Sequence, residues 1–144
     1  MLRNGGPEEG RGNALLAWWM IGISMAAGAL IGLWSFGGPV PAPEGFRDYA
    51  CLPRRLVRLA HIAAIMLPVL NLLYIPWMAR SRWNRRGRRF GLTLLAFGTV
   101  ALPCFLTAAA FLGPALYLLP LPVTALILSI LWLALGLSFQ GAKP

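Results

Sequence analysis

The chain has 144 residues, of which 58% are hydrophobic and only 12% are charged, and its formal net charge is +9. A soluble domain of this size needs a polar surface, because a small body has a large surface for its volume. Thirteen basic and four acidic residues cannot provide that surface. The composition therefore argues against a soluble globular enzyme, and also against a disordered chain, which requires low hydrophobicity. The class that remains is an integral membrane protein.

The charged residues are clustered and leave four long apolar segments. These segments predict membrane spans at about 14–36, 56–78, 90–112 and 121–137, since a bilayer core of about 30 Å takes roughly 17–25 helical residues. The segments show no alternation of period two, which favours helices over strands. In hydrocarbon each span must also satisfy its own backbone hydrogen bonds. We predict an all-α fold, an up-down bundle of four transmembrane helices in a single membrane domain.

The first apolar segment has the general character of a secretory signal peptide. Its run of about 23 residues exceeds the usual 7–15, and no small-x-small cleavage site ends it, so we expect a retained anchor. The glycine-rich and polar residues 1–13 predict a flexible cytoplasmic segment before this anchor.

The distribution of basic residues predicts the orientation. With four spans both termini lie on one side of the membrane, and that side holds nine basic residues, whereas the opposite side holds four. Cytoplasmic loops carry an excess of lysine and arginine. We therefore expect a bacterial inner-membrane protein with both termini and segment 80–89 in the cytoplasm.

Segment 80–89 is the most basic part of the chain, and its six arginines are Arg80, Arg82, Arg85, Arg86, Arg88 and Arg89. One interpretation is nucleic-acid binding, which the interleaved Trp83 favours. The other is orientation and contact with anionic lipid headgroups, at about 1 kcal/mol per charge near the surface. A short loop held between two spans cannot wrap a duplex. We expect lipid headgroups as the partner and no nucleic acid.

No acidic residue lies deep within a predicted span, which argues against a proton-coupled exporter that depends on a membrane carboxylate. Arg54, Arg58 and His61 are spaced i, i+4, i+7 and share one face if the second helix starts early. In one hypothesis the arginines hold headgroup phosphates and His61 bonds a neighbouring helix. In the other, His61 ligates a haem iron and the arginines pair with its propionates, a second axial histidine coming from another subunit. A proton relay through His61 is a third possibility.

Polar residues within the spans predict contacts between helices, each worth about 0.6–2 kcal/mol. The deeper set comprises Ser24, Asn71 and Thr99, and a set nearer the outside comprises His61, Cys104 and Ser129. The second set contains a cysteine and a histidine, as in thiol enzymes. Because no third group or oxyanion donor is identifiable, we predict no catalytic site.

Small residues at Ser24, Gly28 and Gly32 form a stripe that lets another backbone approach closely. The partner helix can belong to the same chain or to a second protomer. Prolines interrupt the second and third spans at positions 68, 76 and 103. Each frees the carbonyl four residues earlier, and such kinks either line a transport path or only shape the bundle.

The stretch from Asp48 to Tyr74 reads DYACLPRRLVRLAHIAAIMLPVLNLLY. It resembles a segment of small bacterial multi-span membrane proteins of uncharacterised function, in a pattern of aspartate-tyrosine, leucine-proline-arginine-arginine, arginine-leucine-x-histidine-isoleucine and asparagine-leucine-leucine. The matching positions are Asp48, Tyr49, Leu52, Pro53, Arg54, Arg55, Arg58, Leu59, His61, Ile62, Asn71, Leu72 and Leu73. The resemblance covers about a fifth of the chain. It implies a multi-span membrane protein without an assigned reaction.

Taken together, these patterns favour an accessory or scaffolding subunit of a membrane complex, acting through helix–helix contacts with other subunits or with a second copy. The first alternative is a haem-associated or redox-complex subunit that uses His61, Arg54 and Arg58. The second alternative is a small permease with a path along the proline-containing helices.

Overall fold

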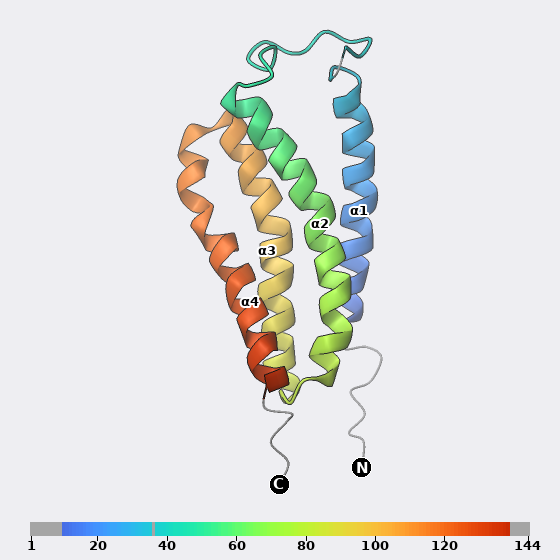
Figure 1. Cartoon of the computed structure of the whole chain (residues 1–144), viewed down its shortest axis with the longest axis vertical. Helices are drawn as coiled ribbons and strands as arrows, with labels where there is room; N and C mark the ends of the chain where they lie inside the picture. The colour runs from blue at the N-terminus through green and yellow to red at the C-terminus, as the bar shows by residue number, and fades with distance from the viewer. Residues whose placement is uncertain (1–9, 36, 139–144) are drawn as a thin grey trace.

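The computed structural model describes residues 10–35 and 37–138. In this part of the chain there are four α-helices and one 3-10 helix and no strand (Figure 1): α1 (Arg11–Gly32), α2 (Leu52–Arg80), α3 (Arg85–Phe111), η1 (Gly113–Leu118) and α4 (Pro120–Ser138). Residues 10–35 and 37–138 contain four helical segments long and apolar enough to cross a membrane, the fourth being η1 with α4. The predicted all-α fold with four candidate spans is confirmed.

The helices run alternately up and down and form an open row (Figure 1). α1 packs on α2, α2 on α3 and α3 on α4, whereas α1 and α4 do not touch within the described residues. We call the end that holds the 81–84 turn between α2 and α3 the turn end. The opposite end, which holds the 33–51 connection, is the loop end. α1 lies at the edge of the row, so most of its circumference has no partner among the residues that the structure describes.

The α2 helix begins at Leu52, four residues before the predicted span. Cys51 precedes it in an extended conformation, and Pro53 lies in the first turn, where a proline costs no hydrogen bond. Arg54, Arg55 and Arg58 therefore belong to the helix itself. This early start meets the condition under which Arg54, Arg58 and His61 share a face.

The arginine-rich segment differs from the predicted ten-residue loop, because only residues 81–84 connect the two helices. α3 already begins at Arg85, and the Asn84 side chain accepts a hydrogen bond from the Gly87 amide at 2.9 Å. Asparagine at this position satisfies one of the amides that a helix start leaves unpaired. The two spans are consequently joined by a tight turn.

The other boundaries differ by smaller amounts. α1 begins at Arg11, so residues 11–13 are helical, contrary to the predicted flexible segment, whose first nine residues lie outside the described part. The α4 helix covers the segment predicted as the fourth span, 121–137, and prolines shape its start: Pro114 lies in the first turn of η1 and Pro120 opens α4. η1 brings the chain from α3 into α4 at the loop end.

The core lies mainly between α2 and α3. Near the turn end, Tyr74 and Met78 of α2 pack against Leu92 and Leu95 of α3. Near the loop end, the buried cluster comprises Leu56, Ala60, Leu106, Ala109 and Ala110. The small residues at the second cluster allow the two helix backbones to approach closely, which is the usual packing mode in hydrocarbon.

Candidate functional site: polar contacts along α1 and α2

Arg54 is the most buried arginine of the described chain, with 7% of its surface exposed. Its Nη1 donates to the carbonyl oxygens of Phe46 at 3.1 Å and Arg47 at 3.4 Å. The guanidinium also lies 4.8 Å from the ring centre of Tyr49, a cation–π distance. Arg54 thus fastens the 33–51 connection to the first turn of α2.

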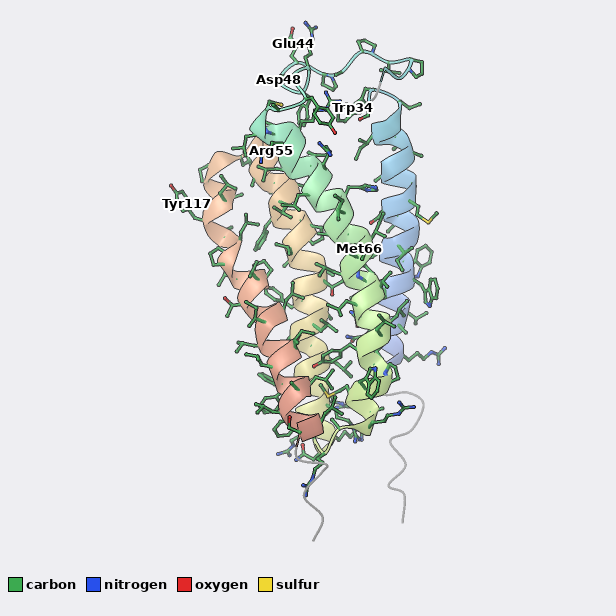
Figure 2. All side chains as sticks on the ribbon, in the orientation of Figure 1. Trp34, Glu44, Asp48, Arg55, Met66 and Tyr117 are labelled. Carbon is green, nitrogen blue, oxygen red and sulfur yellow. The ribbon has the colours of Figure 1, made fainter. Side chains whose placement is uncertain are left out.

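Arg58 lies one turn further along α2 and also contacts Tyr49. Its guanidinium is 4.6 Å from the Tyr49 ring centre. Figure 2 shows the acidic residues of this end, Glu44 and Asp48, in the connection beyond the start of α2. Neither forms an ion pair with Arg54 or Arg58. The two arginines are held by carbonyls and an aromatic ring.

His61 packs directly against α1. A methyl group placed on Gly28 would lie 2.6 Å from Cε1 and 2.8 Å from Nε2 of the imidazole, so a larger residue there would require the His61 ring to move. Gly28 therefore faces α2, as its place in the small-residue stripe predicts. Gly32 does not share this contact, because a methyl group on it would meet nothing within 4 Å.

The residues expected to hold a haem do not fit one. The Nε2 atom, an axial ligand position, faces the α1 backbone at Gly28, which leaves no room for a porphyrin between them. Arg54, expected to pair with a propionate, is buried and bonded to two backbone carbonyls. In the described residues no three His, Cys, Asp or Glu side chains are grouped as metal ligands. Of the three hypotheses for His61, the contacts favour helix packing.

Ser24 is the second contact between α1 and α2. Its Oγ donates to the Ala64 carbonyl at 3.0 Å, and this is the carbonyl that Pro68 leaves without an amide partner. Ser24 of α1 therefore supplies the hydrogen bond that Pro68 removes from the α2 backbone. This hydrogen bond favours a role for Pro68 in shaping the bundle over a role in lining a transport path.

Asn13 makes a contact between helices that the sequence did not predict. Its Nδ2 donates to Asn71 Oδ1 at 3.2 Å and to the Leu92 carbonyl at 2.9 Å. One side chain thus joins α1, α2 and α3 near the turn end. Asn71 is fully buried, and its Nδ2 has no partner among the described residues. The sequence did not predict this contact, because the glycine-rich composition of residues 1–13 is typical of a flexible segment.

The structure does not bring the polar residues into the two predicted layers. Ser24 is level with Ala64, seven residues or about 10 Å along α2 from Asn71. Thr99 is fully buried, and its hydroxyl oxygen has no partner in the described part of the chain.

The set expected nearer the outside is also separated. Cys104 is exposed. The Ser129 hydroxyl donates to Leu126 within α4, and its carbonyl accepts from the Tyr74 hydroxyl at 2.8 Å. Counting residues along a helix predicts how deep a side chain lies in the membrane. It does not predict which side of the helix faces a neighbouring helix, and that orientation determines the contacts.

Two tryptophans close the turn end. The rings of Trp83 and Trp132 are stacked, with centres 3.9 Å apart and planes 5° apart. The Trp83 Nε1 donates to the Trp132 carbonyl at 2.8 Å, and the Trp132 Nε1 donates to the Gly87 carbonyl at 2.9 Å. The Arg82 amide donates to the Gly136 carbonyl at 3.1 Å. These contacts attach α4 to the turn between α2 and α3.

Two arginines of this end contact tryptophans. Arg80 lies over the Trp77 ring at 5.3 Å, and Arg88 donates from Nη1 to the Trp83 carbonyl at 3.3 Å. The last four arginines of the set lie in the first turns of α3, which contain no acidic residue. Cations are unfavourable at the positive end of a helix, by about 0.3–1 kcal/mol each. The arrangement is suited to binding anions.

The free side of α1 carries a second set of small residues that sequence interpretation did not single out. Gly22, Ala26 and Ala29 are exposed, and a methyl group on Gly22 would meet nothing within 4 Å. At 3.6 residues per turn they lie on the side opposite to Ser24 and Gly28. The spacing Gly22-x3-Ala26 is as regular as the stripe that packs on α2, so α1 has small residues on two opposite sides.

No protein-family model, curated protein or solved structure matches this chain. The resemblance of residues 48–74 to small bacterial membrane proteins stays a prediction. Function is therefore argued from the contacts of the chain itself.

Proposed function

We propose that the protein is an accessory or scaffolding subunit of a membrane complex, and that it binds another subunit through the free side of α1. The observation that carries this proposal is the exposure of Gly22, Ala26 and Ala29 on a helix whose opposite side packs on α2. In hydrocarbon, small residues are enriched where two helices approach each other closely.

Both edge helices expose large apolar side chains, on α1 Trp18, Trp19, Ile23, Met25 and Leu30 and on α4 Leu121, Ile127, Leu128, Leu131 and Leu135. They differ in their small residues: α1 exposes Gly22, Ala26 and Ala29 within two turns, whereas Ala134 is the one exposed glycine or alanine of the described α4. Long side chains make extensive contact with lipid tails, whereas glycine and alanine leave a shallow groove that the backbone of another helix can enter. The cluster of three exposed small residues favours α1 as the docking helix, with a transmembrane helix of another subunit or of a second copy as its partner.

The proposal places the chain in a bacterial inner membrane with the turn end and both termini in the cytoplasm. The support is the excess of arginine at the turn end, which follows the positive-inside tendency. Anionic headgroups of the cytoplasmic leaflet then lie beside the arginines in the first turns of α3.

The two alternative functions have less support. The contacts of His61 and Arg54 do not fit a haem. A permease path along the prolines would need polar groups open to a substrate. The carbonyl freed by Pro68 is instead occupied by Ser24.

The test is purification of the tagged full chain from its native membrane in mild detergent. We expect a second membrane polypeptide, or a second copy of the chain, in fixed stoichiometry. Ala26→Leu should reduce its yield at least about tenfold, because a branched side chain separates the two backbones. Ala134→Leu, a matched change at an exposed site on α4, should leave the yield unchanged. A monomer without partner, or equal yields from both variants, would contradict the proposal.

A further inference from the structure

A hollow of about 400 Å³ lies on the outer side of α2 at the loop end. All the residues that line it come from the first three turns of this helix: Leu52, Arg55, Leu56, Arg58, Leu59 and Ile62. Four of them are apolar and two are cationic, and none is acidic. Figure 2 labels Arg55 at the start of α2, where the helix meets the connection from α1.

The two arginines of this hollow are available to a ligand. Arg55 is exposed, and no described residue forms a hydrogen bond or ion pair with its guanidinium. Among the described residues the Arg58 guanidinium has a cation–π contact with the Tyr49 ring, at 4.6 Å, and no ion pair; this contact orients the side chain without neutralising it. Arg54 is different, because its guanidinium is buried and already bonded to the connection.

The position of these charges favours an anion. Arg55 and Arg58 lie within the first two turns of α2, and its first turn contains no acidic residue. The amino end of a helix carries a partial positive charge, so cations there repel it and a bound anion relieves both repulsions. Arginine presents several N–H donors in a planar fork that matches phosphate oxygens.

The apolar part of the hollow continues toward the middle of the membrane. Leu59 and Ile62 are exposed, with fractions of 51% and 53%, and Met66 follows one turn later on the same side. A ligand that fits this surface has an anionic group at the membrane boundary and a hydrocarbon chain beneath it. A free phosphate ion would leave the apolar half of the hollow empty.

We propose that this hollow binds one anionic phospholipid. Its phosphate lies between the guanidinium groups of Arg55 and Arg58, and one acyl chain lies along Leu59 and Ile62. The site is on α2, away from the free side of α1, so it does not depend on the proposed docking of another subunit.

The experiment places a photoreactive benzoylphenylalanine at Ile62 in the full chain. The protein is reconstituted in vesicles with equal amounts of phosphatidylglycerol and phosphatidylcholine whose acyl chains differ in mass, and the lipid adducts are identified by mass spectrometry. We expect phosphatidylglycerol adducts to exceed phosphatidylcholine adducts about fivefold or more, given the attraction of each arginine for anionic lipid. The same probe at Ile127 of α4, in the middle of a lipid-exposed span, should show no preference.

Replacing both arginines of the hollow by glutamine (R55Q with R58Q) should bring the ratio at Ile62 to about one, whereas replacing both by lysine should preserve it. Arg47→Gln, at the same end but outside the hollow, should have no effect. An unchanged probe reaction at Ile127 verifies that the variants remain folded. A ratio near one in the unchanged chain, or a preference that survives the double glutamine variant, would overturn the proposal. So would a preference abolished by inorganic phosphate but not by sodium chloride of equal ionic strength, since the site would then take free phosphate.

Discussion

The two ends of the row of helices are held by different means. At the turn end, four residues join α2 to α3, and the stacked Trp83 and Trp132 attach α4 through ring contact and indole hydrogen bonds. At the loop end, a connection of 19 residues, 33–51, joins α1 to α2. Arg54 holds it through two carbonyls, and Phe46 lies 5.8 Å from Trp34 and 5.6 Å from Phe111.

The contacts at the two ends distinguish the rigid part of the chain from the part that is attached less firmly. The stacked Trp83 and Trp132 rings and their two indole hydrogen bonds join the three helices α2, α3 and α4 as one unit. By contrast, α1 is attached along one side only, through Asn13, Ser24 and Gly28. A helix that is fastened at one edge and exposed elsewhere is the part of the molecule best placed to receive another helix.

Loss of the tryptophan pair should have the largest effect on stability. Trp132→Ala removes the stacked ring and the hydrogen bond to the Gly87 carbonyl. We expect the free energy of unfolding to fall by about 3 kcal/mol, as for other large-to-small changes of a packed tryptophan. The measurement is unfolding in mixed micelles followed by circular dichroism. Trp19→Ala, at an α1 side chain that is 72% exposed, is the matched control and should cost less than about 1 kcal/mol. Equal losses in both variants would mean that the turn end is not locked by this pair.

Loss of Arg54 should have a smaller and more local effect. Arg54→Gln removes a charged donor from the Phe46 and Arg47 carbonyls, at a cost of about 2 kcal/mol. We expect faster amide hydrogen exchange in the connection 33–51 and unchanged exchange in residues 81–98. Arg55→Gln, the neighbouring arginine without such bonds, should leave both regions unchanged. Exchange that rises equally in the two variants would show that Arg54 does not fasten the connection.

The sequence predicts the spans well because the bilayer sets their length and excludes charge. It predicts their ends less well, since arginine is a good helix former and its long side chain can reach the membrane boundary from within a helix. For this reason α2 starts at Leu52 and α3 starts at Arg85, inside segments that looked like loops.

The candidate site was predicted only in part, for a related reason. Gly28 and His61 were both singled out, and they meet across the α1–α2 interface. The stripes Ser24–Gly28 and Gly22–Ala26 have the same spacing, so periodicity alone cannot tell which one packs within the chain. Asn13 and Trp132 were missed because their partners lie 58 and 49 residues away in the sequence, and one sequence carries no information on such pairs.

The most direct test of the central claim is cross-linking from the free side of α1 in the native membrane. A photoreactive benzoylphenylalanine at Gly22, where an added Cβ atom would meet no described atom within 4 Å, should give an adduct with a second membrane polypeptide or a second copy of the protein. The same probe at Leu131, exposed on α4, should give lipid adducts alone. Lipid adducts alone at both positions would show that α1 faces only the bilayer, and would contradict the account of this protein as a subunit that docks through α1.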